Sequence, residues 1–258
     1  MQMKDSGSTS SKPRILMLDL ETFPNLFMAW RLWQGYPLEV KEFSYICCFS
    51  AKWLGGKHTT KALCDYKTSD PEKSLILDLW KLVDEADILV AHNGVQFDFS
   101  RMNSQFIKHK LDPPSPSQKV DTKKVAKEVF GFDSNSLDNL CLFLGLGEKL
   151  ETGGYDLWRQ CMANNPTAWA KMKKYNAHDV ILLEKLYLKL LPWMPKHPNL
   201  SLFEDRGACP KCGKKTLIGR GVYRSTTRTY QRFQCTSCGG WSRGTHLIDK
   251  TKITNTNI

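Results

Sequence analysis

The stretch "ILMLDLETF", residues 15–23, places two carboxylates inside an otherwise apolar strand pattern. Side chains alternate between the two faces of a strand, so Asp19 and Glu21 share one face with Leu20 between them. Two unpaired buried carboxylates would each cost several kcal/mol, and the strand itself contains no Lys or Arg. The pattern therefore requires a basic partner from elsewhere in the chain or a bound cation. The alternative is that these carboxylates only cap or pair near the end of the strand.

The composition is that of an ordinary globular protein. The 258 residues are enough for one good-sized domain and a small one, and 41% are hydrophobic and 24% charged. No apolar run approaches the roughly 20 residues of a membrane span. The N-terminal "MQMKDSGSTSSKP" lacks the apolar centre of a secretion signal, so we expect a polar tail and a cytoplasmic protein without a membrane partner.

The formal net charge of +11 is concentrated at the C-terminal end. Residues 196–258 contain 12 Lys and Arg against 3 Asp and Glu, which leaves about +2 for the rest of the chain. A basic balance confined to one end favours an acidic partner, nucleic acid first. The alternative is a solvated tail that aids solubility.

The hydrophobic patterns predict a mixed β-sheet flanked by helices, the α/β class. Strands are expected at residues 14–22 and 86–93, and a hairpin pair at 43–53 and 58–66. One helix is expected to begin at Asp70-Pro71, with a stripe of leucines at 75, 77, 79 and 82, and further helices are expected at 97–110, 121–130, 136–145 and 166–191.

Further carboxylates stand at the ends of these elements. Asp98 in "HNGVQFDF" follows a strand and begins a helix, while Tyr175 and Asp179 in "YNAHD" are four residues apart on one helical face. Taken singly, Asp98 is consistent with a carboxylate that begins a helix, and Tyr175 is consistent with a side chain of the hydrophobic core. Together with Asp19 and Glu21 they form an ordered set of four carboxylates and one tyrosine.

These residues resemble the motifs of the DEDD superfamily of 3′–5′ exonucleases, which have an RNase H-like fold. Asp19 and Glu21 in "DLET" match the first motif, Asp98 the second, and Tyr175 with Asp179 the tyrosine form of the third. The histidine form would need His at position 174, where this chain has Lys. The resemblance extends over about residues 14–192 and is closest to the phage and bacterial branch.

The resemblance implies hydrolysis by two Mg²⁺ or Mn²⁺ ions about 3.5–4 Å apart. In such a site Asp19 bridges both ions, Glu21 and Asp179 complete the site that activates water, and Asp98 serves the second ion partly through water. Tyr175, with an ordinary pKa of about 10, is a poor base and instead aims the water.

Substrate contacts are predicted around the same motifs. We expect Asn93 and Thr22 to touch the terminal nucleotide and Phe97 to wedge against its base. The alternatives are a turn residue for Asn93 and core packing for Phe97. Asp121 is predicted to be a helix N-cap, with a role near the site as the other possibility.

Two C-x-x-C pairs, Cys209/Cys212 and Cys235/Cys238, are separated by 22 residues. They resemble the knuckles of a zinc ribbon, in which four thiolates hold one structural Zn²⁺. A redox C-x-x-C would not explain two pairs.

The segment around these knuckles alternates cations with aromatic rings, as in proteins that track phosphates and stack bases. The residues predicted to bind substrate here are Lys214, Lys215, Arg220, Arg224, Arg228, Tyr230 and Arg232. The alternative is a hairpin whose aromatic face packs on itself while a separate basic face is solvated.

The sequence thus predicts a tail (1–13), an RNase H-like exonuclease domain (14–195), a linker (196–207), a zinc ribbon (208–245) and a second tail (246–258). The predicted activity is metal-dependent removal of nucleotides from a 3′ end. We favour single-stranded DNA over RNA as substrate, although these residues do not decide between them. Two alternatives stay open, a non-catalytic protein that binds nucleic-acid ends and an endonuclease on the same fold.

Overall fold

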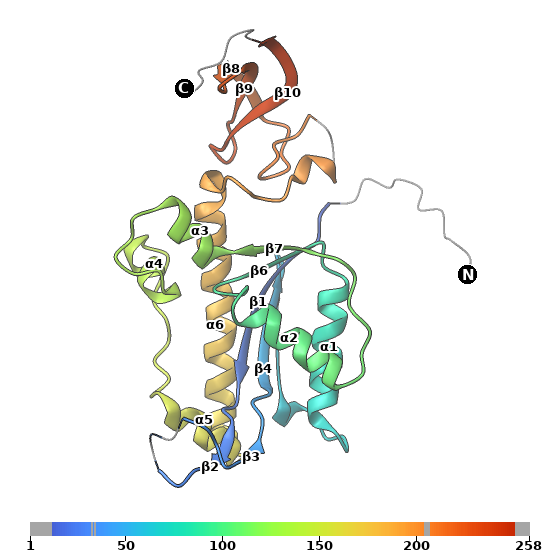
Figure 1. Ribbon diagram of the computed structural model, residues 1–258, viewed down its shortest axis with the longest axis vertical. Coiled ribbons are helices and arrows are strands. Elements are labelled where there is room, and N and C mark those ends of the chain that lie inside the picture. Colours follow the sequence, from blue (N-terminus) through green and yellow to red (C-terminus); the bar gives the residue numbers. More distant parts are fainter. Residues whose placement is uncertain (1–11, 32, 34, 204–206, 251–258) are drawn as a thin grey trace, which may run out of the picture. The chain divides into compact units, whose positions relative to one another are not determined.

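The computed structural model of the protein describes residues 12–31, 33, 35–203 and 207–250 (Figure 1). The chain divides into two compact units, Arg14–Tyr187 and the segment from Leu188 onward. The first unit contains a five-stranded sheet and the second a three-stranded sheet. No helix in the described ranges has the length and apolar character needed to cross a membrane.

The five-stranded sheet has the order β5-β4-β1-β6-β7. Its strands are β1 (Ile15–Thr22), β4 (Ile46–Trp53), β5 (His58–Ala62), β6 (Ile88–Ala91) and β7 (Gln118–Asp121). Strand β1 is central and pairs antiparallel with β4 and parallel with β6. The predicted mixed sheet and the predicted β4–β5 hairpin are therefore confirmed.

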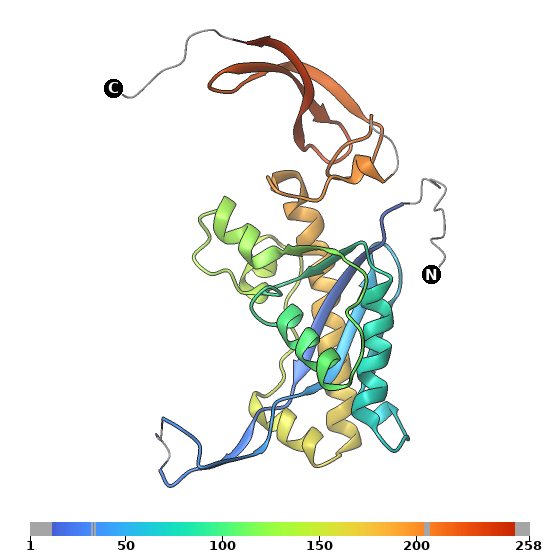
Figure 2. The ribbon, with the colours of Figure 1, turned by 45° about the vertical axis from the view of Figure 1, so that its right-hand side comes forward.

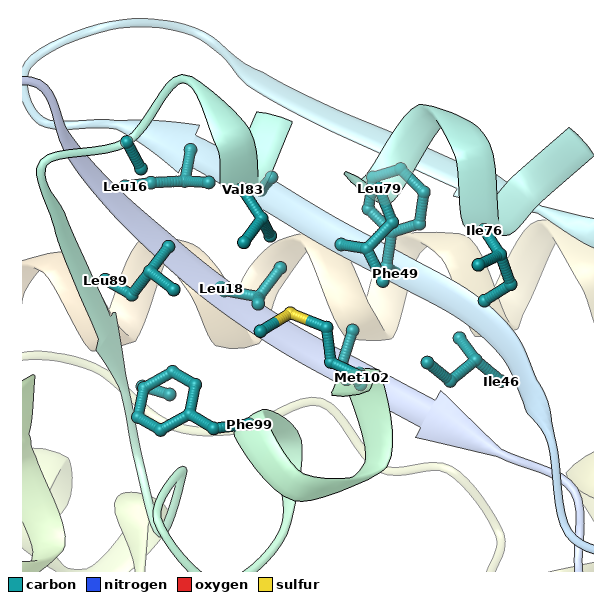
Figure 3. Close-up of a cluster of buried hydrophobic side chains, with 14 of the residues drawn as sticks. Leu16, Leu18, Ile46, Phe49, Ile76, Leu79, Val83, Leu89, Phe99 and Met102 are labelled. Carbon is teal, nitrogen blue, oxygen red and sulfur yellow. The ribbon is translucent and has the colours of Figure 1, made fainter. Parts of the chain in front are cut away.

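Helices α1 (Pro71–Asp84) and α2 (Asp98–Lys108) cover one face of this sheet, as Figure 3 shows. Their apolar side chains, including Leu79 and Met102, pack with Leu16 and Leu18 of β1, and all four are essentially inaccessible to solvent. Leu20 continues the same row, so the even-numbered residues of β1 face α1 and α2.

Helices α5 (Tyr155–Met162) and α6 (Pro166–Leu190) cover the opposite face. Trp169 and Met172 of α6 are buried there against Cys48 of β4. An ion pair between Lys52 Nζ and Glu184 Oε2 (2.8 Å), largely shielded from solvent, joins β4 to α6. Because side chains alternate along β1, Asp19 and Glu21 face α6 rather than α1 and α2.

Five elements of this unit were not predicted from the sequence. They are β7, helix α5, the strands β2 (Leu26–Met28) and β3 (Glu39–Glu42) of a hairpin that follows β1 directly, and a 3₁₀ turn at Leu63–Asp65, where the strand predicted to run to residue 66 has already ended. Figures 1 and 2 show this hairpin projecting away from the sheet. Helices α3 (Thr122–Val129) and α4 (Leu137–Phe143) follow β7 where the sequence predicted them.

The second unit contains short 3₁₀ turns (Leu191–Trp193 and Leu200–Leu202) and a sheet of order β10-β9-β8. Its strands are β8 (Leu217–Arg224), β9 (Arg228–Cys235) and β10 (Trp241–Lys250). Strand β10 pairs with β9 as far as Lys250, five residues beyond the end predicted for the ribbon. Residues 1–11 and 251–258 of the two predicted tails lie outside the described residues.

Candidate active site

Three of the predicted carboxylates meet between β1 and α6. Asp19, Glu21 and Asp179 each offer an oxygen atom, and these atoms lie within 4.8 Å of one another. Strand alternation supplies the first two, and the position of α6 against the sheet supplies the third. The sequence prediction that these side chains gather is confirmed.

Asp98 reaches the same region as the first residue of α2, directly after the turn that follows β6. Strand β6 pairs with β1 only along Ile15–Met17, so the backbone N–H of Leu20 has no strand partner on that side. Asp98 Oδ1 accepts a hydrogen bond from this N–H at 3.1 Å. The turn is tight: a Cβ on Gly94 would lie 2.5 Å from Ala91 Cβ. Asp98 is thereby held beside β1, although it is not one of the three clustered carboxylates.

Burial raises the pKa of every carboxyl in this group, and repulsion between carboxylates adds to this for Asp19 and Glu21. Burial, reinforced by the negative charge of Asp179, raises the pKa of Glu21 to about 8. Burial also raises the pKa of Asp98 to about 7 and raises the pKa of Asp179. The pKa of Asp19 rises well above its ordinary range because it is buried and has Asp98, Glu21 and Asp179 as neighbours. A cation bound among these carboxyls would favour their ionised forms.

The donor set fits a hard divalent cation. Carboxylate oxygens are the protein ligands that Mg²⁺ and Mn²⁺ prefer. In addition, Asp179 Oδ1 is buried and finds no hydrogen-bond donor among the described residues. Asp19, Glu21 and Asp179 are the residues that would hold such an ion.

Lys149 also belongs to the site and was missed by the sequence analysis. Its Nζ lies 2.6 Å from Asp179 Oδ2 and donates a hydrogen bond to the Tyr175 hydroxyl oxygen at 2.9 Å. Burial would lower the pKa of Lys149, but the Asp179 carboxylate outweighs that effect and raises it. Burial, together with Asp179, raises the pKa of Tyr175 as well, so its hydroxyl stays protonated at neutral pH.

The loop that carries Lys149 is fixed on both sides. The Lys149 backbone N–H donates to Asp138 Oδ1 at 3.0 Å. His178 Nε2 donates to the carbonyl oxygen of Glu148 at 2.7 Å, so His178 points at this loop and not at the carboxylates. Lys149 is a residue of a Gly-rich loop without periodicity, and only its ability to pair with one of the predicted carboxylates could have drawn attention to it.

Asn176 is a second residue that the sequence analysis missed. It is fully buried, and its Nδ2 donates to Asp19 Oδ2 at 2.6 Å. Cys48 Sγ in turn donates to Asn176 Oδ1 at 3.6 Å. Asn176 therefore fixes the orientation of Asp19 from α6, one residue after Tyr175.

The residues predicted to touch the terminal nucleotide lie at the ends of strands near the carboxylates. Thr22 ends β1 where its register with β4 shifts, and Phe97 directly precedes Asp98. Asn93 adopts a positive φ of 72°, and its backbone N–H donates to Asp121 Oδ1 at 3.0 Å. The backbone of Asn93 is thus part of a turn, and a substrate contact by its side chain stays a prediction.

Asp121 is the N-cap of α3, as the sequence predicted. Besides Asn93 it accepts hydrogen bonds from the backbone N–H groups of Val95, Lys123 and Lys124. These contacts tie the turn after β6 to the end of β7.

The four cysteines of the second unit also come together. The Sγ atoms of Cys209, Cys212, Cys235 and Cys238 lie within 4.8 Å of one another. The two knuckles repeat one pattern: Gly213 N–H donates to the Cys209 carbonyl at 2.9 Å, and Gly239 N–H donates to the Cys235 carbonyl at 2.8 Å. Both glycines have positive φ, 73° and 77°, as the turn requires.

The thiol set fits Zn²⁺, which prefers four tetrahedral sulfur ligands in structural sites. Burial raises the pKa of the Cys235 thiol, but hydrogen bonds from Thr216 Oγ1 (3.1 Å) and the Cys238 N–H (3.5 Å) lower it to about 6. A thiol of this kind is ready to bind a metal as thiolate.

Two arginines of this unit stack on aromatic rings of the sheet. The Arg243 guanidinium lies 4.2 Å from the Tyr230 ring centre, and that of Arg232 lies 4.7 Å from the Trp241 ring centre. Tyr230 is only 7% exposed, so this ring does not present an open surface, whereas Trp241 is 45% exposed. The other predicted cations are placed on β8 (Arg220 and Arg224), at the start of β9 (Arg228) and before β8 (Lys214 and Lys215).

Comparison with known proteins places the first unit in a family. Residues 38–191 match the model of the RNase H superfamily, so the chain belongs to the RNase H superfamily. The matched residues include Asp98, Tyr175 and Asp179.

Two polymerases are similar to parts of the chain. DNA polymerase III PolC-type from Ureaplasma parvum serovar 3 (strain ATCC 700970) is 35% identical over 71 residues, which are 27% of this chain and 5% of that protein. The structure of the family B DNA polymerase from the hyperthermophilic archaeon Pyrobaculum calidifontis matches with a TM-score of 0.53 and 17% identity, over 75% of this chain and 26% of the other. The chain thus spans a small part of each polymerase.

Proposed function

We propose that the protein is a metal-dependent 3′–5′ exonuclease of the DEDD superfamily, in its tyrosine subgroup. The observation that carries the proposal is the meeting of Asp19, Glu21 and Asp179 beside Tyr175, with Asp98 held at the edge of β1. Membership of the RNase H superfamily supports it, since this fold provides such sheets with acidic residues. The likeness to parts of two DNA polymerases favours DNA as the substrate.

The acidic residues have one task in this proposal, which is to hold divalent cations beside the scissile phosphate. Mg²⁺ or Mn²⁺ bound there would acidify a water molecule and stabilise negative charge on the phosphate oxygens. Asp19, Glu21 and Asp179 would hold one ion, and Asp98, held beside β1 by the Leu20 N–H, would serve the second. Asn176 keeps Asp19 turned toward the ion through its 2.6 Å hydrogen bond.

The protonated Tyr175 hydroxyl orients the attacking water and does not remove its proton. Its raised pKa leaves no phenolate at neutral pH. Lys149 donates to the hydroxyl oxygen, which leaves the hydroxyl hydrogen directed at an acceptor such as water. Lys149 thereby fixes the orientation of Tyr175 and adds positive charge near the phosphate.

The second unit binds the substrate strand in this proposal. One Zn²⁺ held by the four cysteines would stabilise the unit, and its cations neutralise phosphates along single-stranded DNA. Thr22, Asn93 and Phe97 contact the terminal nucleotide. The predicted division into an exonuclease domain, a linker and a ribbon is part of the same proposal.

The test uses zinc-loaded protein and matched 5′-labelled single-stranded DNA and RNA, with Mg²⁺, with Mn²⁺ and with neither. We expect the 5′-labelled strands to be shortened stepwise from the 3′ end only when Mg²⁺ or Mn²⁺ is added. The DNA strand should be shortened faster than the RNA strand. Asp19→Asn should lower the rate about a thousandfold or more, because it removes several kcal/mol of stabilisation while its side chain still fits Asn176. A variant as active as the parent would overturn the assignment of the site.

Two other outcomes identify the alternatives. Intact substrate that shifts in a gel indicates a protein that binds nucleic-acid ends without cutting. Cleavage of circular single-stranded DNA indicates an endonuclease.

A further inference from the structure

The β2–β3 hairpin is the feature of the first unit that the proposed function leaves unused. It leaves the end of β1 directly, and Trp30 is only nine residues beyond Glu21. A chain of that length spans at most about 30 Å. The hairpin therefore belongs to the surroundings of the carboxylates.

The root of the hairpin is firmly attached beside the site. Phe23 N–H donates to the Tyr45 carbonyl at 3.0 Å, and Ser44 N–H donates to Asn25 Oδ1 at 2.7 Å. The Phe23 ring contacts both the Tyr45 ring (5.4 Å between centres) and Trp169 of α6 (5.8 Å). Phe23 and Trp169 are buried, so the root is part of the core that also positions Tyr175 and Asp179 on α6.

The outer part of the hairpin is aromatic and exposed. We define the aromatic tip as Phe27, Trp30, Trp33 and Tyr36, which are 56%, 84%, 96% and 84% exposed. Large exposed apolar surfaces are uncommon on monomeric proteins and mark binding sites. Only one charged residue, Arg31, lies between Phe27 and Leu38, and it is a cation.

We propose that the aromatic tip stacks on the bases of a single-stranded nucleic acid whose 3′ end lies at the carboxylates. This inference rests on the proposed function and adds a second contact region to it, within the nuclease unit. Flat aromatic faces bind every base, so the tip would hold the strand without selecting a sequence.

Three observations favour nucleic acid over a protein partner or a second copy of the chain. The tip is continuous with the candidate active site through β1 and its buried root. Its most exposed members are Trp and Tyr, whose rings offer two faces for stacking. Its single charge is positive. Of the two acidic residues of β3, Glu42 lies at the root opposite Leu26, and Glu39, opposite Met28, is paired with Lys41 Nζ at 2.7 Å.

The test compares three double variants at Trp30 and Trp33: to Ala, to Leu and to Phe. Affinity is measured for single-stranded DNA of about twelve nucleotides, long enough to reach the tip. This measurement uses zinc-loaded full-length protein carrying Asp19→Asn, so that no substrate is cut. The Ala and Leu pairs should weaken binding about tenfold or more, and the Phe pair should restore most of it. Ile107→Ala, at a 77% exposed apolar residue of α2, is the control and should change nothing.

Digestion by the active protein separates this inference from the proposed function. The Ala pair should slow removal of nucleotides from the long strand and leave cleavage of a dinucleotide unchanged. Equal affinity and equal digestion by the Ala pair and the parent would overturn the inference, even if the exonuclease activity is real. If no protein digests DNA, the proposed function fails, and the binding series still decides the role of the tip. Loss with Ala but retention with Leu would contradict stacking, because it would show that an apolar contact without a ring is enough to hold the strand.

Discussion

The carboxylate cluster and the cysteine cluster both gather anionic ligands within 4.8 Å, yet the chain builds them in different ways. The carboxylates come from residues 19 to 179 and are carried by a strand and a helix that a large apolar core positions. The cysteines come from two short knuckles that repeat one hydrogen-bonding pattern within a small unit. We infer that the first unit holds its cation site in place, whereas the second unit depends on its metal to fold.

The largest expected effect is the loss of zinc from the second unit. Apparent zinc binding to small thiolate sites contributes about 10–16 kcal/mol, and the sheet β8–β10 has few buried apolar side chains to replace it. Cys212→Ser in the full-length chain should therefore abolish slow amide exchange in β9 and leave β1 and β4 protected. Exchange measured by mass spectrometry checks this.

Cys64→Ser is the matched control, since Cys64 is exposed and lies outside the cluster. It should leave exchange unchanged in both units. Persistent protection of β9 in Cys212→Ser would show that this sheet folds without a complete metal site.

A smaller effect on stability is expected from the ion pair between Lys52 of β4 and Glu184 of α6. Lys52→Met removes the cation and leaves the largely shielded Glu184 carboxylate with the Gly55 N–H as its remaining donor (2.8 Å), which should lower the free energy of unfolding by about 3 kcal/mol. Denaturant unfolding of the first unit, followed by far-ultraviolet circular dichroism, measures it. Lys41→Met breaks an exposed pair with Glu39 and should cost less than about 1 kcal/mol. Equal losses of unfolding free energy in Lys52→Met and Lys41→Met would mean that the ion pair between β4 and α6 stabilises the protein no more than an exposed pair does.

Lys149→Met should have the smallest of these effects, and it is measured on catalysis with the divalent cation bound, because the cation keeps positive charge beside the Asp179 carboxylate when Lys149 is lost. Lys149 acts through Asp179 and Tyr175, and the loss of such a supporting contact typically costs about 10–100-fold. We expect kcat to fall by this factor with KM little changed, and Lys149→Arg to recover part of it. An unchanged kcat would leave Lys149 with only a structural role.

The sequence predicted the fold and the main ligands because their signals are local and ordered. Strand alternation placed Asp19 and Glu21 on one face, helical spacing paired Tyr175 with Asp179, and the C-x-x-C pairs indicated a knuckle site. Lys149 and Asn176 were missed because their partners lie 30 and 157 residues away, and no pattern in their neighbourhood reports those contacts.

The same limit explains the elements that were missed. Strand β7 (QKVD) contains only one apolar residue and becomes a strand by pairing with β6. The hairpin after β1 has no short turn signal between its strands, and its apolar residues resemble core until the structure shows them exposed.

The central claim is that the clustered carboxylates are a cation site, and the pH dependence of stability tests it most directly. Their folded-state pKa values are raised, to about 8 for Glu21 and about 7 for Asp98, so the folded state binds more protons than the unfolded state above about pH 4. The contribution of these carboxyls to the free energy of unfolding should therefore be greatest below about pH 4 and should decrease as the pH rises toward about 8.

The measurement is the free energy of unfolding of the first unit in zinc-loaded full-length protein, between about pH 5 and pH 8, with and without Mn²⁺. Without Mn²⁺ we expect the free energy of unfolding to decrease across this pH range. With Mn²⁺ the decline should disappear in the parent but persist in Asp19→Asn, because the ion favours the ionised carboxylates only when its ligands are complete. If Mn²⁺ leaves the free energy of unfolding of the parent protein unchanged at pH 8, the clustered carboxylates are not a site for this cation.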